Sequence, residues 1–162
     1  MKHTLSVMVE NKFGVLSRVA GLFSGRGYNI ESLCVAPTIE PSVSLMTIVT
    51  TGDDAVIEQV CKQLNKLIDV IKVWDVTGKN FIDREMVLIR VSARKDSRDE
   101  IMRIVQILEC SVVDVGENSL IIEASGDDAR IETLLKMLKP HGIRELVRTG
   151  KVAMLRADQK KA

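Results

Sequence analysis

Hydrophobic residues near the start of the chain follow first a strand-like and then a helix-like spacing. Leu5, Val7 and Val9 alternate with polar or smaller residues, which is typical of a strand with one buried face. After a loop over residues 11–14, apolar residues three and four positions apart indicate a helix, namely Val15, Val19, Leu22 and Phe23. We expect Gly25 and Gly27 to end this helix, because glycine tolerates the left-handed geometry of a C-terminal cap.

Apolar runs over 30–36 and 43–49 predict two further strands, joined by a turn that contains Pro37 and Pro41. Thr51 and Asp54 have the three-residue spacing of a capping box, which predicts the start of a second helix. The buried side of that helix is expected to be Val56, Val60, Leu64 and Leu67. With a fourth strand over 70–76, the order is that of a ferredoxin-like unit, whose helices cover one face of an antiparallel sheet.

The same order of elements recurs in the second half of the chain. Strands are predicted over 86–91, 112–115, 120–124 and 143–147. Two helices are marked by the apolar stripes Ile101, Ile104, Val105, Leu108 and Ile131, Leu134, Leu135, Leu138. The start of the last helix, Ser125-Gly126-Asp127-Asp128-Ala129, repeats Thr51-Gly52-Asp53-Asp54-Ala55, which indicates duplication of one supersecondary unit. We therefore predict an α+β fold of two tandem ferredoxin-like (βαββαβ) domains.

The junction between the two repeats is expected at residues 77–80, which have turn composition and no apolar period. The predicted division is a first domain over 1–77, a linker over 78–83 and a second domain over 84–157. Residues 158–162 are expected to form a disordered tail. Apolar positions within 151–155 fit no element of the repeat.

Composition and charge exclude several classes of function. The formal net charge is +1, so no field is expected that would hold nucleic acid or an anionic membrane. Cys34, Cys61 and Cys110 stand far apart in apolar runs, where buried reduced thiols are expected rather than a disulfide or a metal site. No signal peptide and no membrane-spanning run is recognisable, and we expect a cytoplasmic protein.

Enzymes and RNA-binding modules with this topology need residues that the chain lacks. An RNA-recognition module would stack bases on aromatic side chains, and the strand over 43–49 has none. An acylphosphatase-like enzyme would hold a phosphoryl group with an arginine after the first strand, where this chain has Asn11 and Lys12. His3 stands near a chain end and His141 at a helix end, where a helix-capping or solvent-exposed role is expected rather than that of a general base. The acidic pairs at the helix starts complement the helix dipole. No metal-ligand spacing occurs.

A small-molecule binding site is the function that the first loop favours. The amides around Gly14, Val15 and Leu16 open a helix and lack intrahelical partners, so they could receive a carboxylate. The side-chain oxygens of Asn11 and Asn29 could accept hydrogen bonds from an ammonium group. Spacing alone leaves a second interpretation open, in which the asparagines only make turns and Gly14 only caps the helix.

These residues belong to a longer pattern. Asn11-x-x-Gly14-Val15-Leu16-Ser17-Arg18-Val19 and the run from Arg26 to Leu33 resemble the small regulatory subunit of acetohydroxyacid synthase, also called acetolactate synthase. Residues 1–77 are similar to its ACT domain. Weaker similarity continues through the second half, at Arg84-Glu85 and Arg148-Thr149-Gly150.

The resemblance implies a non-catalytic subunit in branched-chain amino-acid biosynthesis. Such subunits bind a catalytic subunit, raise its activity and confer feedback inhibition, usually by valine. The resemblance implies a homodimer of ACT domains and an effector site formed by Asn11, Gly14, Val15 and Leu16 of one chain with Asn29 and Ile30 of its partner. No catalytic residue, metal or cofactor is expected in this chain, because thiamine diphosphate and magnesium belong to the catalytic subunit. The alternative is a free-standing ACT-domain amino-acid sensor that regulates another target.

Overall fold

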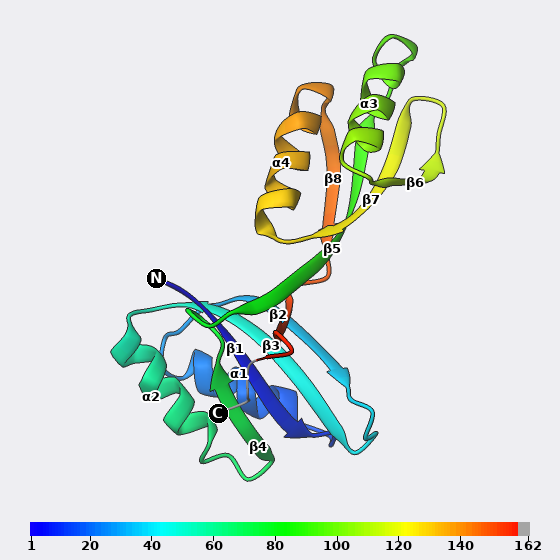
Figure 1. The fold of residues 1–162 in the computed structure, drawn as a ribbon. Helices are drawn as coiled ribbons and strands as arrows, with labels where there is room; N and C mark the ends of the chain where they lie inside the picture. The colour runs from blue at the N-terminus through cyan, green and yellow to red at the C-terminus, as the bar shows by residue number, and fades with distance from the viewer. Residues whose placement is uncertain (159–162) are drawn as a thin grey trace. The chain divides into compact units, whose positions relative to one another are not determined.

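The computed structural model describes residues 1–158 and divides into two compact units (Figure 1). The first comprises Met1–Ile82 and the chain from Lys151 onward, and the second comprises Asp83–Gly150. The predicted tail, 158–162, lies outside the described residues except for Asp158. No helix in the described part of the chain is long and apolar enough to cross a membrane.

The first unit has the predicted order of strands and helices. Its elements are β1 (Lys2–Glu10), α1 (Val15–Ser24), β2 (Ile30–Pro37), β3 (Val43–Thr51), α2 (Asp54–Leu64) and β4 (Val70–Asp75). The strands pair antiparallel in the order β2-β3-β1-β4, so β2 and β4 form the two edges of this sheet. Together with the second unit, this arrangement confirms the predicted α+β fold.

Both helices of the first unit pack on one face of its sheet. The alternating residues Leu5, Val7 and Val9 of β1 are buried there with Val19 and Phe23 of α1. The buried stripe of α2 is Ile57, Val60 and Leu64, with Val56 only half-buried.

The capping box predicted at the start of α2 is wrong. Thr51 still belongs to β3, and its hydroxyl contacts Glu31 on the neighbouring strand. Because β3 extends this far, the N-cap falls at Asp53, whose side chain accepts a hydrogen bond from the Val56 amide at 2.7 Å. Asp54 occupies the first turn, where a carboxylate complements the helix dipole as expected.

The opposite face of the first sheet is covered by a returning strand. β9 (Val152–Leu155) pairs with β5, which begins at Phe81, and the Arg156 amide donates to the Asn80 carbonyl at 3.2 Å. Ala153 is buried there with Trp74 and Val76, next to a set of partly buried apolar residues, namely Met8, Leu45, Phe81 and Leu155. The apolar positions within 151–155 therefore complete the first unit, whereas the sequence-based division assigned them to the second domain.

The second unit repeats the topology of the first. Its elements are β5 (Phe81–Ser92), α3 (Lys95–Ile107), β6 (Ser111–Val115), β7 (Ser119–Gly126), α4 (Asp128–Leu138), a 3-10 turn (Lys139–His141) and β8 (Ile143–Arg148). The strand order is β6-β7-β5-β8. Asp127 caps α4 as Asp53 caps α2, so the repeated Gly-Asp-Asp-Ala sequence has the same local structure in both units.

Candidate functional site

The loop between β1 and α1 is tied to the turn between β2 and β3. The Asn11 amide donates to the Ser42 carbonyl at 2.7 Å, and Asn11 Nδ2 donates to the Pro41 carbonyl at 2.9 Å. The side-chain nitrogen of Asn11 is thus engaged within the loop, and its oxygen Oδ1 is the atom that can accept from a ligand.

Gly14 is the N-cap of α1 and has a left-handed backbone, with φ of +81°. The first regular helical hydrogen bond runs from the Arg18 amide to the Gly14 carbonyl at 3.1 Å. The Val15 amide makes a long 3.4 Å contact to the Lys12 carbonyl. Of the amides that the sequence indicated, Val15 is therefore engaged, and those of Leu16 and Ser17 are left as donors in the first turn of the helix.

The side chains of this first turn point in different directions. Val15 is buried in the core of the unit, so only its backbone could meet a ligand. Leu16 is 42% exposed, and Phe13, within the loop, is fully exposed. The loop thus combines unpaired amides with accessible apolar side chains.

Arg18 and Asp69 form an ion pair beside Gly14 that the sequence did not reveal. Arg18 Nε and Nη2 both lie near Asp69 Oδ2, at 2.8 and 2.6 Å, and the Asp69 side chain is largely buried. A Cβ on Gly14 would stand 3.1 Å from Arg18 Nη1, so the guanidinium packs against the glycine. The helix dipole disfavours a cation in the first turn of a helix. This unfavourable placement of Arg18 was the one sign in the sequence that the residue has an acidic partner.

A second ion pair lies on the same loop. Lys12 Nζ is 2.6 Å from Glu10 Oε2, and the hydrogen bond to Glu10, together with its charge, raises the pKa of the exposed Lys12 ammonium. Lys12 and Arg18 are thus each balanced by a carboxylate.

Asn29 and Ile30 lie at the other end of the same sheet. Ile30 pairs with Thr50, and Thr50 pairs with His3 at the start of β1, whereas Asn11 follows the end of β1. Asn29 is exposed, and its carbonyl accepts a hydrogen bond from Thr50 Oγ1 at 2.6 Å. Within one chain the structure therefore brings together Asn11, Gly14, Val15 and Leu16 but not Asn29 and Ile30.

Comparisons with known proteins identify the family of both units. Residues 5–72 match the acetohydroxyacid synthase (AHAS) small subunit-like ACT domain, and residues 84–157 match the family described as the small subunit of acetolactate synthase. The chain belongs to the acetolactate synthase small-subunit family. A probable acetolactate synthase small subunit from Archaeoglobus fulgidus is 52% identical, over 99% of this chain and all of that protein. The acetolactate synthase small subunit of Aquifex aeolicus is 49% identical, over 96% of this chain and 81% of that protein.

A solved relative supports the family assignment at the level of structure. The acetolactate synthase small subunit from Thermotoga maritima superimposes with a TM-score of 0.89 at 37% identity, covering 98% of this chain and 99% of that one. As an acetolactate synthase small subunit, the chain is an ACT-type regulatory subunit whose partner is the catalytic subunit of that enzyme. Among its described residues, no group of three or more His, Cys, Asp or Glu side chains is arranged to hold a metal ion.

Proposed function

We propose that this small subunit activates the catalytic subunit of acetolactate synthase and confers feedback inhibition by valine. In this proposal the chain performs no chemistry itself, and thiamine diphosphate and magnesium act on the catalytic subunit. The observation that carries the proposal is the start of α1, where the Arg18 guanidinium packs against Gly14 and the Leu16 and Ser17 amides follow in the first turn.

The start of α1 has the chemistry of a carboxylate site. Helix-end amides and the positive end of the helix dipole both favour an anion. Arg18 binds Asp69 through Nε and Nη2, which leaves Nη1, the nitrogen next to Gly14, for a second carboxylate. Gly14 has no Cβ, so a bound carboxylate can approach the backbone closely. The exposed side chain of Leu16 can pack against the branched side chain of the effector.

A second copy of the chain would complete the site. β2 is an edge strand with one unpaired side, and pairing it with a partner's β2 removes that exposed edge. The two strands would run antiparallel about a twofold axis, so the start of the partner's β2 would meet the end of this one. Pro37 at that end pairs with Ser44, close to the loop that Asn11 holds. The partner subunit's Asn29 would then lie near Asn11 and Gly14.

Calorimetric titration of the isolated subunit with valine, leucine and isoleucine tests the effector site directly. We expect saturable valine binding by a dimer, with the dimeric state measured by sedimentation. Valinamide is the matched control ligand, because it keeps the ammonium and the side chain but has no carboxylate. Valinamide binding as tight as valine would contradict a carboxylate site at α1, and valine binding by a monomer would contradict the two-chain geometry.

A further inference from the structure

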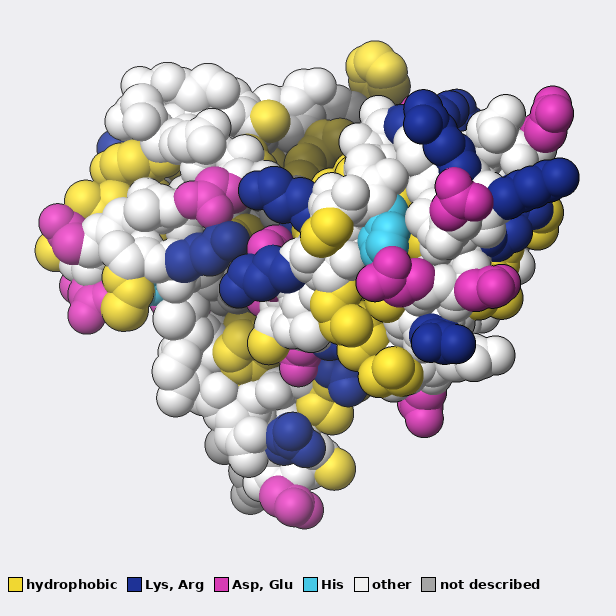
Figure 2. Space-filling view, turned by 90° about the horizontal axis from the view of Figure 1, so that it is seen from above, with side chains coloured by type: hydrophobic (Ala, Val, Ile, Leu, Met, Phe, Trp, Pro, Cys, Tyr) yellow, Lys and Arg dark blue, Asp and Glu magenta, His cyan; other side chains and the backbone are white. Residues whose placement is uncertain are grey.

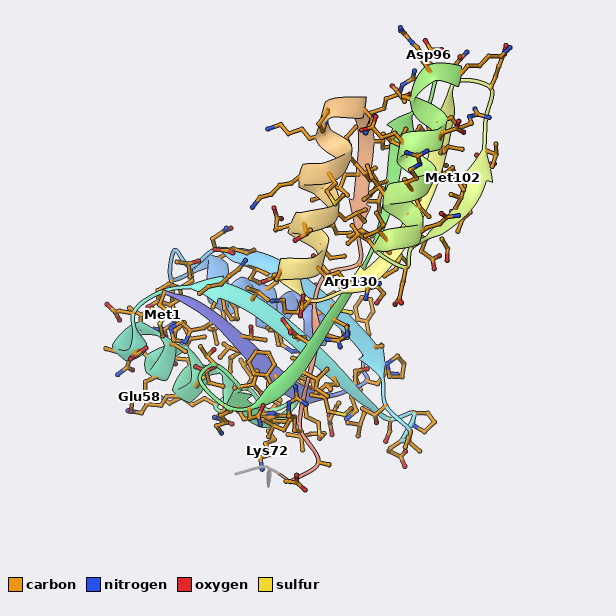
Figure 3. The ribbon with its side chains drawn as sticks, turned by 45° about the horizontal axis from the view of Figure 1, so that its top comes forward. Met1, Glu58, Lys72, Asp96, Met102 and Arg130 are labelled. Carbon is orange, nitrogen blue, oxygen red and sulfur yellow. The ribbon has the colours of Figure 1, made fainter. Side chains whose placement is uncertain are left out.

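A separate pocket lies at the opposite end of the first unit from the Gly14 loop. It has a volume of about 530 Å³ and is formed by one side of α2, the edge strand β4 and the turn that follows it. Its apolar wall includes Ile57 and Cys61 from α2 and Val73 from β4. Met1 and Glu58, which line the rim, lie on the α2 side of this unit in Figure 3. A volume of this size is within the range of small-molecule sites.

The pocket contains a buried histidine with one unsatisfied nitrogen. The His3 side chain is only 3% exposed, and its Nδ1 lies 3.0 Å from Asp75 Oδ2. Asp75 is held in turn by the Thr77 amide, which donates to Oδ1 at 2.8 Å. Among the described residues, His3 Nε2 has no hydrogen-bond partner, and Asp54 Oδ1 stands 3.5 Å away. Buried polar atoms of this kind are rare and require a partner.

The hydrogen bond to Asp75 determines which kind of ligand group can bind to His3 Nε2. A carboxylate only accepts, so His3 Nδ1 carries the proton in this hydrogen bond, and in that tautomer Nε2 presents a lone pair. Nε2 and the Asp54 carboxylate are therefore two neighbouring acceptors, and the group that satisfies both is a donor with positive charge. A ligand carboxylate would be repelled by Asp54 and Asp75, which both line the pocket.

The rest of the pocket favours a compact apolar body. Ile57 is buried, and burial together with the charge of Asp75 raises the pKa of Cys61 to about 11, so its thiol stays neutral. Glu58 on the rim is already paired with Lys62 at 2.6 Å. The groups that can form polar contacts with a ligand are thus concentrated at the His3 end of the pocket. The remaining wall can contact the hydrocarbon part of a ligand.

We propose that this pocket binds a small primary amine with a compact apolar body, whose ammonium group donates to His3 Nε2 and to the Asp54 carboxylate. The site does not involve the α1 loop or a second chain. Its occupancy is independent of the valine site, so the failure of either proposal is visible without the other.

The test observes His3 directly, because the chain has only one other histidine, His141. Nitrogen-15 NMR of the histidine rings in the full chain is recorded with isobutylamine, isobutanol and isobutyrate, which share a hydrocarbon body and differ in charge. Isobutylamine is expected to shift the His3 signals saturably, with a Kd of about 1 mM or tighter, and to leave His141 unchanged. The other two probes are expected to have at least tenfold weaker effects.

A pair of matched variants distinguishes an effect on ligand binding in the pocket from a general effect on folding. Asp54→Asn removes one acceptor charge and is expected to weaken isobutylamine binding about tenfold. Asp128→Asn changes the corresponding first-turn position of α4 and is the matched control, with no expected effect on binding. Equal responses to isobutylamine and isobutanol, or no saturable His3 shift at about 10 mM amine, would overturn the proposal. A free-state spectrum with both His3 nitrogens protonated at neutral pH would also overturn it, because an imidazolium bridging Asp75 and Asp54 needs no ligand.

Discussion

Replacing Gly14 with aspartate is expected to weaken valine inhibition while leaving activation intact. At a φ of +81° any L side chain is strained, and a Cβ at this position would meet Arg18 Nη1 at 3.1 Å. The introduced carboxylate would compete with the effector for the guanidinium and would lie about 4 Å from the effector carboxylate, where two like charges repel by roughly 4 kcal/mol at an effective dielectric of about 20. If solvent screening and pairing with Arg18 remove half of this, about 2 kcal/mol remains, which weakens binding roughly thirtyfold.

The assay is acetolactate synthase activity of the reconstituted complex as a function of valine concentration. Gly14→Asn is the matched control, because asparagine has nearly the same size and tolerates the left-handed region but adds no charge. It is expected to shift the inhibition curve less than aspartate does. Unchanged valine inhibition in the aspartate variant would refute effector binding at this loop, and equal shifts in both variants would refute the electrostatic reasoning.

Two further predictions concern the first unit. A fragment that ends at Asn80 should unfold at a lower urea concentration than a fragment in which Ile82 is joined to Lys151 by a short glycine–serine linker. The reason is that only the linked fragment retains β9, which packs over Trp74 and Val76. Equal urea midpoints would contradict a stabilising role for β9. Cys61 should react slowly with a thiol reagent at neutral pH and faster as the pH approaches its pKa of about 11, which burial raises from 9.0. The neutral Cys61 thiol therefore contributes to folding stability fully below pH 9.0, and this contribution is lost as the pH rises through about 11. Rapid labelling of the folded protein at neutral pH would contradict the burial of this thiol.

The repeated fold could be predicted from the sequence because each sheet buries one face beneath its helices. Alternation at Leu5, Val7 and Val9, and the helical spacing from Val15 to Phe23, record that one-sided burial locally. The placement of residues 151–155 could not be predicted in this way, because their partners in β1, β3 and β4 are distant in sequence. The capping residue of α2 was also missed, because the end of β3 at Thr51 depends on pairing with β1.

The surface charge follows the composition. The numbers of basic and acidic residues nearly cancel, and on the face drawn in Figure 2 the two kinds of side chain are interspersed.

The candidate site was predictable only where it is local. The turn from Asn11 to Leu16 is a continuous segment, and the structure confirms Gly14 at the start of α1. The Arg18–Asp69 pair joins residues 51 positions apart and required the fold to be known. The contribution of Asn29 and Ile30 stays a prediction, because it depends on pairing β2 with a second chain.

In the proposed function, this chain makes its catalytic partner both more active and sensitive to valine. The most direct test is to assay acetolactate formation from pyruvate, thiamine diphosphate and magnesium by the catalytic subunit alone, by this chain alone, and by the mixture with and without valine. We expect no activity from this chain alone, higher activity from the mixture than from the catalytic subunit, and inhibition of the mixture by valine. Activity from this chain alone, or a mixture that behaves like the catalytic subunit with and without valine, would contradict it.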